Sequence, residues 1–223
     1  MISIIGIGNG ASRIAEQFST YSQYDIYGMN DGVARTSKYK FRLKNYETPE
    51  EYENNIPNVA KFFKNLQDRV QVFVMGASYS SNYTLAILQQ IKDKKIELYY
   101  IQPDTTLLAG VPKLIEATTF GVLQEYARSG LLENITLVSN LKIEEIVTDV
   151  PVKQYYSTLN STIQSTVHYL NYFEHNEPEI GVMAPSAEIC RIRTLGMLNM
   201  KNLEEKWFFD LDIKSIGSSR GLF

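Results

Sequence analysis

Apolar residues in this chain gather into short runs that alternate with longer amphipathic segments. Runs such as MISIIGIG and VQVFVM are almost continuously apolar over the length of a strand, which is typical of strands buried on both faces. The segments between them place apolar residues three and four positions apart, as amphipathic helices do. We therefore predict an α/β fold, a Rossmann-like three-layer parallel sheet with helices on both faces, because parallel neighbours need long crossover connections.

The predicted elements follow one another in a regular order. The predicted strands comprise residues 1–8, 24–29, 39–43, 70–75, 96–101 and 135–139. The predicted helices comprise residues 11–18, 57–66, 84–91, 111–128 and 152–173. The polar stretch from Lys44 to Asn55 is expected to be a loop, and the helix after it is expected to begin near Pro57, where the missing N–H costs little. The late aromatic cluster from Trp207 to Phe209 is expected to pack on the sheet or to serve an intermolecular contact.

Composition and charge narrow the classes of function. The net charge is −3 over 223 residues, and Lys and Arg are spread along the chain, which argues against nucleic acid or an anionic membrane as a partner. No apolar run reaches the roughly 20 residues that cross a bilayer, and the opening segment is too short and Gly-rich for a signal peptide. We therefore expect a cytoplasmic protein. A single cysteine, Cys190, and two histidines argue against a disulfide, a metal centre or a Cys/His protease.

Two strand-to-helix turns carry the candidate chemistry, GIGNGAS from Gly6 to Ser12 and GASYSSN from Gly76 to Asn82. In a parallel sheet both turns lie at the carboxyl edge, where helix N-termini and glycine admit phosphate oxygens. We expect them to hold one di- or triphosphate, although tight turns and helix caps use the same residue types without a ligand. The predicted phosphate-binding residues are Gly6, Gly8, Asn9, Gly10, Gly76, Ala77, Ser78, Tyr79, Ser80 and Ser81.

Asp31 supports an alternative interpretation. This residue ends the second predicted strand about 20 residues beyond Gly10, where a dinucleotide-binding protein places its ribose-binding acid. The G-x-G-x-x-G template is met only at its first two glycines, because Ala11 occupies the third position. A Rossmann-type NAD-binding enzyme therefore stays open as an alternative.

The order of elements resembles the tubulin/FtsZ family over nearly the whole chain. GIGNGAS is similar to the family's first glycine loop, MND at Met29 to Asp31 resembles its second loop, and GASYSSN stands in the place of the signature GGGTGTG. The resemblance implies that Asn30 and Asp31 join the two turns in holding GTP or GDP. It also implies a role for Mg²⁺ in balancing the phosphate charge.

The resemblance extends to the parts that hold the base and activate water. The segment TFGVLQEYARSGLLENITLVSN is similar to the family's helix and strand that end in a guanine-binding asparagine, which gives Asn140 that role. At the start of the central helix, Tyr156 and Asn160 are the implied base contacts. GVMAPSAE resembles the loop that one subunit inserts into the neighbouring nucleotide pocket, so Glu188 is the candidate catalytic acid. An acid near a helix start has an equally ordinary explanation in the helix dipole.

Three departures from the family pattern shape the predicted function. The second turn has one glycine and places Tyr79 near the phosphate path, and Pro185 replaces the family's first catalytic acid. Few residues follow Glu188, whereas the family carries a second α/β domain there. We therefore expect a GTP-binding protein that self-associates head to tail with weak or lost GTPase activity. A nucleotide-free tubulin-like structural or interaction protein is a further alternative.

The expected domain organisation follows from the same resemblance. It comprises a nucleotide-binding domain at 1–150, the central helix and following loop at 151–180, and a remnant or start of the C-terminal domain at 181–223.

Overall fold

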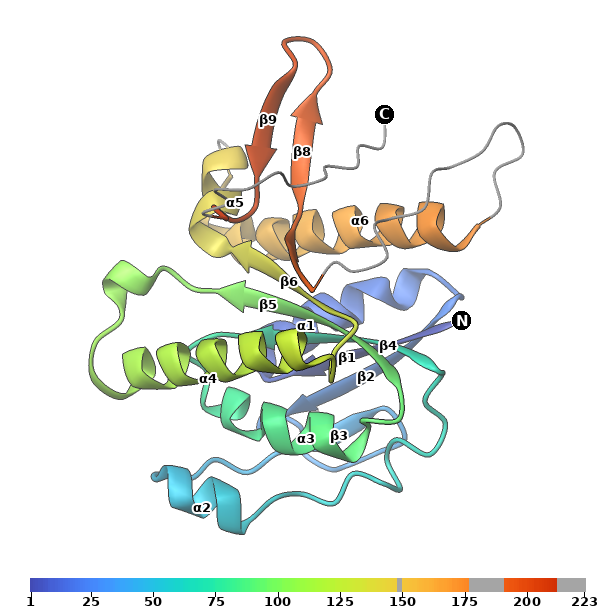
Figure 1. Cartoon of the computed structure of the whole chain (residues 1–223), viewed down its shortest axis with the longest axis vertical. Helices are drawn as coiled ribbons and strands as arrows, with labels where there is room; N and C mark the ends of the chain where they lie inside the picture. The colour runs from blue at the N-terminus through green and yellow to red at the C-terminus, as the bar shows by residue number, and fades with distance from the viewer. Residues whose placement is uncertain (148–149, 177–190, 212–223) are drawn as a thin grey trace.

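The computed structural model describes residues 1–147, 150–176 and 191–211. Within these residues, parallel strands form one seven-stranded sheet in the order β3-β2-β1-β4-β5-β6-β7 (Figure 1). The strands are β1 (Ile2–Ile7), β2 (Tyr24–Asn30), β3 (Lys40–Arg42), β4 (Arg69–Met75), β5 (Lys95–Gln102), β6 (Asn134–Ser139) and β7 (Ile192–Thr194). The predicted parallel α/β sheet is confirmed, and its six predicted strands are β1 to β6.

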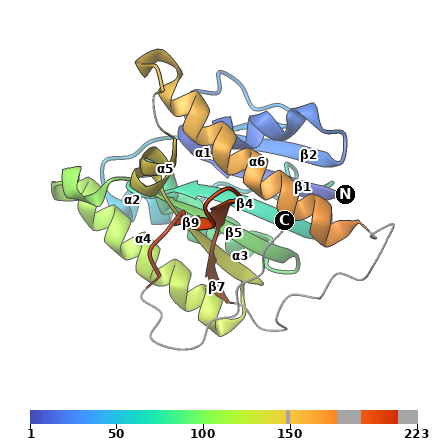
Figure 2. The same cartoon turned by 90° about the horizontal axis from the view of Figure 1, so that it is seen from above.

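Helices cover both faces of the sheet (Figure 2). One face carries α1 (Asn9–Gln17), α5 (Asn140–Ile146) and α6 (Tyr155–His175). The other face carries α2 (Pro49–Asn54), α3 (Thr84–Gln90) and α4 (Gly110–Ser129). Neighbouring strand residues supply the two cores in turn, as Ile4 does for the first face and Ile5 for the second. Burial on both faces explains why the strands are nearly continuous apolar runs.

The predicted long helices are confirmed. Helix α4 ends at Gly130, whose φ of 83° lies in the left-handed region that favours glycine after a helix. Helix α6 follows a single 3₁₀ turn at Val152–Gln154 and continues to His175. No helix in the described part of the chain is both long and apolar enough to span a bilayer.

The prediction for the segment between β3 and β4 is wrong. The expected loop contains helix α2, which begins with a capping box in which the Glu51 N–H donates to Thr48 Oγ1 and the Thr48 N–H donates to Glu51 Oε2. The residues after Pro57 form turns instead of a helix, although Val59 and Phe63 are buried as their spacing implied. The capping box satisfies the first amides of α2, so the helix begins earlier than the apolar spacing indicated.

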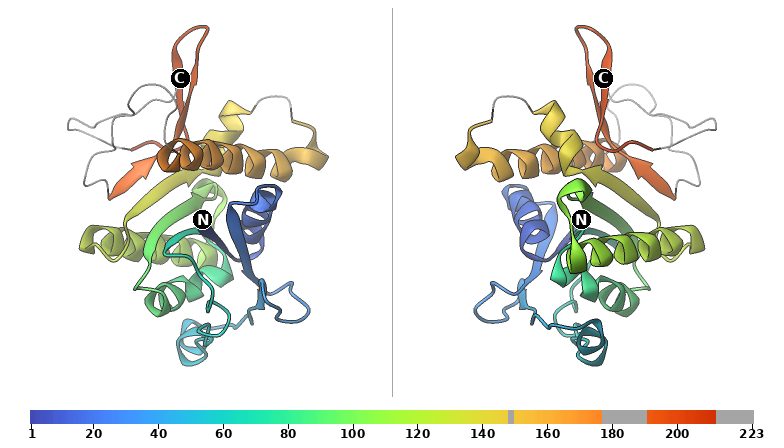
Figure 3. Two further views of the ribbon diagram at one scale, coloured as in Figure 1. Left: turned by 90° about the vertical axis from the view of Figure 1, so that its right-hand side faces the viewer. Right: turned by 90° about the vertical axis from the view of Figure 1, so that its left-hand side faces the viewer.

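The residues after 191 add elements that the sequence did not predict. Strand β7 pairs with β6, and β8 (Gly196–Asn199) and β9 (Glu204–Trp207) form an antiparallel hairpin that projects from the body (Figures 1 and 3). Phe208 is fully buried below the hairpin, where its N–H donates to Leu195 O and its carbonyl accepts from the Ser139 N–H. Within the aromatic cluster, Phe208 therefore packs in the core, whereas Trp207 is exposed. The assignment of 181–223 to a second domain stays a prediction.

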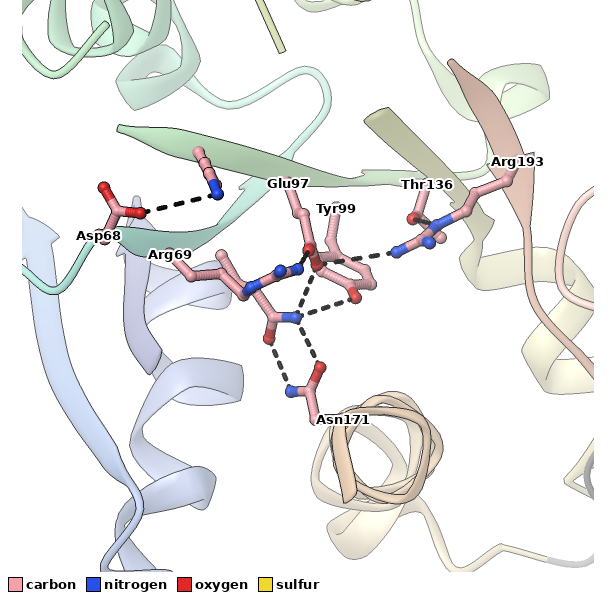
Figure 4. A network of polar contacts seen from close by, with 9 residues as sticks. Asp68, Arg69, Glu97, Tyr99, Thr136, Asn171 and Arg193 are labelled. Carbon is pink, nitrogen blue, oxygen red and sulfur yellow. Dashed lines mark hydrogen bonds and ion pairs between the residues drawn. The ribbon is translucent and has the colours of Figure 1, made fainter. Parts of the chain in front are cut away.

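A polar network is buried where α6 crosses the amino ends of β4 and β5 (Figure 4). The Glu97 carboxylate accepts from Arg69 Nη1 at 2.6 Å and from Gln71 Nε2 at 2.9 Å, and Arg193 Nη2 lies 3.8 Å from it. Asn171 of α6 bonds to Gln71 in both directions, at 2.7 and 2.8 Å. The buried side chains of Gln71, Glu97 and Asn171 thus have partners away from water, whereas the Arg69 side chain is 37% exposed. The network therefore holds the second half of α6 over the amino ends of the strands.

Candidate functional site

The strand order reverses direction between β1 and β4, which are neighbours in the sheet: β2 and β3 follow on one side, and β5, β6 and β7 follow on the other. After β1 the chain turns to the face that carries α1, and after β4 it turns to the face that carries α3. Open α/β sheets bind ligands in the crevice at such a switch point, outside the carboxyl ends of the strands. The two predicted turns follow these two strands, so both lie at this point.

The first turn presents an uncapped helix N-terminus. Gly8 adopts φ 95° and ψ 167°, a conformation that favours glycine, and its N–H donates to Met29 O at 2.7 Å. Helix α1 begins directly afterwards at Asn9, with no side-chain cap and no acidic residue in its first turn. Free amides and the positive end of the helix dipole favour an anion at this end.

The neighbouring glycines of this turn have packing reasons of their own. A Cβ on Gly6 would lie 2.5 Å from Ala11 O, and one on Gly10 would overlap the Met75 sulfur. Both residues therefore allow α1 to pack closely on the sheet. Their presence does not by itself indicate a ligand.

The second turn lies against the first. A Cβ on Gly8 would be 3.3 Å from both Ser78 Oγ and Ser80 Cβ, so the two turns are in contact. The residues Tyr79–Tyr83 form a 3₁₀ turn, in which the Ser81 hydroxyl donates to Ser78 O at 2.6 Å. Ser80 and Ser81 are buried, whereas Tyr79 is exposed. The Ser81 hydroxyl therefore already has an internal partner.

The backbone of the second turn is tightly constrained where it leaves β4. A Cβ on Gly76 would lie 2.5 Å from Tyr100 Oη, so only glycine fits there. Ala77 has φ 58°, a left-handed conformation that is unusual for alanine. Strained positions of this kind gather at functional sites, and this one stands in the predicted phosphate turn.

Asp31 ties the end of β2 to the first turn. Its Oδ1 accepts from Asn9 Nδ2 at 2.5 Å, and its Oδ2 accepts from Asn45 Nδ2 at 2.6 Å. Asn30, at the end of β2, accepts from the Leu43 N–H through its carbonyl. Each carboxylate oxygen of Asp31 thus has a partner within the protein, which weakens its assignment as a ribose-binding acid.

Asn45, which bonds to Asp31, was not among the site residues predicted from the sequence. It lies within the stretch that was expected to be a loop, just after β3. Its position after a strand could have identified it, since polar residues that follow parallel strands meet at one edge of the sheet.

The predicted base contacts lie at the same edge, on the α5 and α6 side. Asn140 is the first residue of α5 and follows β6 directly, and Tyr156 and Asn160 are in the first two turns of α6 (Figure 1). Tyr156 is exposed, whereas Asn140 and Asn160 are half-buried. No hydrogen bond within the described residues joins these three to the two turns. Glu188 lies outside the described residues.

A separate pocket of about 450 Å³ lies between β3 and the end of α2. Its lining carries the positive charges of Arg42 and Lys44 and shares no residue with the predicted site. It is lined by Phe41, Arg42, Leu43, Lys44, Tyr46, Asn54, Asn55, Ile56, Pro57 and Tyr83. In the described part of the chain, no group of three His, Cys, Asp or Glu side chains is arranged to hold a metal ion.

Comparison with known proteins identifies the fold. No family model and no curated protein matches the sequence. The empty FtsZ dimer of M. jannaschii superposes with a TM-score of 0.63 and 14% identity over 82% of this chain and 57% of that one. The GTPγS-form TubZ protofilament of Bacillus thuringiensis serovar israelensis gives 0.61 and 13% over 78% and 57%. The chain has a tubulin/FtsZ-like fold.

A third member of this group, the GTPγS-bound CetZ2 protofilament of Haloferax volcanii, matches with a TM-score of 0.55 and 11% identity over 76% of this chain and 57% of that one. The tubulin/FtsZ-like fold expected from the order of elements is therefore confirmed. The chain spans 57% of the length of each of these three structures.

Proposed function

We propose that this tubulin/FtsZ-like protein binds GTP or GDP in the crevice between the turns after β1 and β4. The observation that carries the proposal is the contact of Gly8 with Ser78 and Ser80, beside the uncapped start of α1. A polyphosphate at this place would accept hydrogen bonds from the free amides of α1 on one side and would contact the second turn on the other. Mg²⁺ bound to the phosphates would balance their charge.

The base is proposed to lie toward α5 and α6. The network around Asn171 holds the second half of α6 over the amino ends of the strands, so the first turns of this helix lie near their carboxyl ends. The side-chain amides of Asn140 and Asn160 can each donate and accept hydrogen bonds, as recognition of a guanine edge requires.

Self-association completes the proposal. The similar structures include protofilaments and a dimer. We propose that copies of this chain, in the cytoplasm, associate head to tail. Glu188 of one copy would orient water beside the nucleotide of the next. The single glycine of the second turn and the proline at 185 fit a slow or absent GTPase.

One observation favours a second candidate, a tubulin-like interaction protein without nucleotide. The second turn is closed on itself, because the Ser81 hydroxyl and amide both bond to Ser78 O. In that case the two turns would serve only to pack α1 and α3 on the sheet.

A binding titration separates these candidates. Purified protein is titrated with fluorescently labelled GTP, GDP, ATP and NAD in the presence of Mg²⁺. Saturable binding of GTP and GDP, with at least tenfold weaker binding of ATP, is the expected result. Absence of all binding would support the interaction protein, and a preference for NAD would support a Rossmann-type enzyme.

A variant tests the placement of the base without disturbing the phosphate turns. Asn140→Ala should reduce the preference for GTP over ATP, because the amide that would distinguish guanine is lost. Asn54→Ala, a change at an exposed asparagine at the end of α2, is the matched control. An unchanged nucleotide preference in Asn140→Ala would contradict the base site at α5.

A further inference from the structure

The pocket between β3 and the end of α2 has the size of a small-molecule site. Its volume is about 450 Å³, and sites for small ligands generally measure roughly 300–1,000 Å³. Strand β3 lies at one edge of the sheet, and α2 packs on the face that also carries α3 and α4 (Figure 1). Tyr83, which lines the pocket, directly follows the second turn. The pocket therefore adjoins the proposed nucleotide crevice without sharing a residue with it.

The walls of this pocket are held in place by the protein itself. The Tyr83 hydroxyl donates to Lys44 O at 2.9 Å, and the Tyr46 N–H donates to Tyr52 Oη at 3.1 Å. The ring of Tyr52 makes edge-to-face contacts with Tyr46 and Tyr83, with centroids 5.3 and 4.9 Å apart. Tyr52 and Tyr83 are buried. A ligand would therefore enter a formed cavity and would not have to order these segments.

The lining combines apolar surface with positive charge. Most of the lining side chains are aromatic or aliphatic, two of them, Arg42 and Lys44, are cationic, and no Asp or Glu lines the pocket. Neither cation forms an ion pair with a described residue, and Arg42 Nη1 donates to Ala34 O at 3.4 Å. Positive charge that no lining acid compensates attracts an anion, and apolar walls favour a ligand with an apolar body.

The pocket lacks the backbone donors that hold a polyphosphate. Its helical part is the C-terminal end of α2, where unpaired carbonyl groups and the negative end of the helix dipole lie. Pro57, in the same segment, has no N–H to donate. A ligand with one negative charge fits these surroundings better than a nucleotide does.

From the formed walls, the apolar lining and the two cations, we propose that the pocket binds a small aromatic carboxylate. The ring system of the ligand lies against the apolar lining, and its carboxylate pairs with Lys44 and Arg42. This site is additional to the proposed nucleotide site and does not depend on it.

Two probes of opposite charge provide the test. The ¹⁵N-labelled full chain, without nucleotide, is titrated with 2-naphthoate and separately with 2-naphthylmethylammonium, which has the same ring system. We expect 2-naphthoate to bind with a dissociation constant below about 1 mM. It should shift the amide signals of the lining residues Leu43, Lys44, Tyr46 and Ile56. The cationic probe should bind at least about tenfold more weakly, because the two cations of the pocket repel it.

Two substitutions assign the recognition of charge to the pocket. Arg42→Gln and Lys44→Gln should each raise the dissociation constant of 2-naphthoate about threefold, which is the size expected for an exposed ion pair. Lys61→Gln, at an exposed lysine outside the lining, is the matched control. Thermal melts of the three variants verify that they fold.

The proposal is overturned if 2-naphthoate does not bind, if both probes bind equally, or if the shifts lie at Gly8 and Ser78 and not at the lining residues. It is equally overturned if Arg42→Gln and Lys44→Gln bind 2-naphthoate as the wild type does, or if Lys61→Gln weakens binding as much. These outcomes leave the GTP site untouched, because the labelled-nucleotide titration tests that site separately.

Discussion

Gln71 of β4 and Asn171 of α6 exchange two hydrogen bonds between their side-chain amides, at 2.7 and 2.8 Å, although 100 residues separate them in the sequence. Both side chains are buried. The pair joins the sheet to the long helix that carries the proposed base contacts, so its strength bears on both the stability and the placement of that helix.

Asn171→Ala should lower the free energy of unfolding by about 1–3 kcal/mol, because it leaves the buried Gln71 amide without this partner. Urea denaturation measures the change. Asn54→Ala, at an exposed asparagine, should change the free energy by less than about 0.5 kcal/mol. Equal effects of the two substitutions would show that the amide pair adds nothing to stability.

The buried surroundings of His168, in the same region, disfavour its charged form. The Asn171 amide donates to Tyr24 Oη at 3.4 Å, and the Tyr24 hydroxyl forms a hydrogen bond of 3.0 Å with His168 Nδ1. Burial raises the pKa of Tyr24 and lowers the pKa of His168. The His168 ring also stacks on Tyr21, with centroids 3.6 Å apart. Because burial disfavours the charged ring, charging this histidine opposes the fold.

Stability should therefore decrease as the pH falls below about 6.5, where unfolded histidine takes up a proton that the folded state resists. The loss from this group continues until the lowered pKa of folded His168 is reached, with a slope of at most about 1.4 kcal/mol per pH unit. His168→Gln should lose less stability than the wild type between pH 7.5 and 5.5 in urea denaturation. Parallel curves for the two proteins would refute this role.

Gly8→Val should abolish GTP binding. Its side chain would lie 3.3 Å from the second turn and obstruct the proposed phosphate path, and the positive φ adds strain of about 1–3 kcal/mol. The labelled-GTP titration measures the loss, and a thermal melt verifies folding. Gly121→Ala, at a helical glycine with open space around it, should bind GTP normally. Unchanged affinity in Gly8→Val would rule out this phosphate site.

Glu188→Ala should leave GTP affinity unchanged while lowering any GTP turnover that rises with protein concentration. The reason is that the carboxylate would act on the nucleotide of a neighbouring copy and not on its own. Phosphate release at several protein concentrations measures the effect, with Glu144→Ala as the matched control. A wild-type rate in Glu188→Ala would exclude the residue from hydrolysis.

The sequence alone determined the class of fold and the location of the two turns. Strands buried on both faces are mostly apolar along their length, so β1, β4, β5 and β6 stand out in the chain. The crossover helices between them make the sheet parallel, and a parallel sheet brings the turns after β1 and β4 to one edge. These signals are local in sequence or follow from simple rules of connection.

Only the tertiary structure decided which polar groups meet. Gln71 and Glu97 interrupt apolar strands and thereby signal buried polar groups, but their partners, Asn171 and Arg193, lie far along the chain. Helix α2 could not be predicted from apolar spacing either, because its capping box lies in a polar stretch with few apolar residues. The β8–β9 hairpin has weak alternation, and among the described residues its two strands pair only with each other. A residue pattern fixes which way a side chain points along its own element, whereas the partner it meets depends on the path of the whole chain.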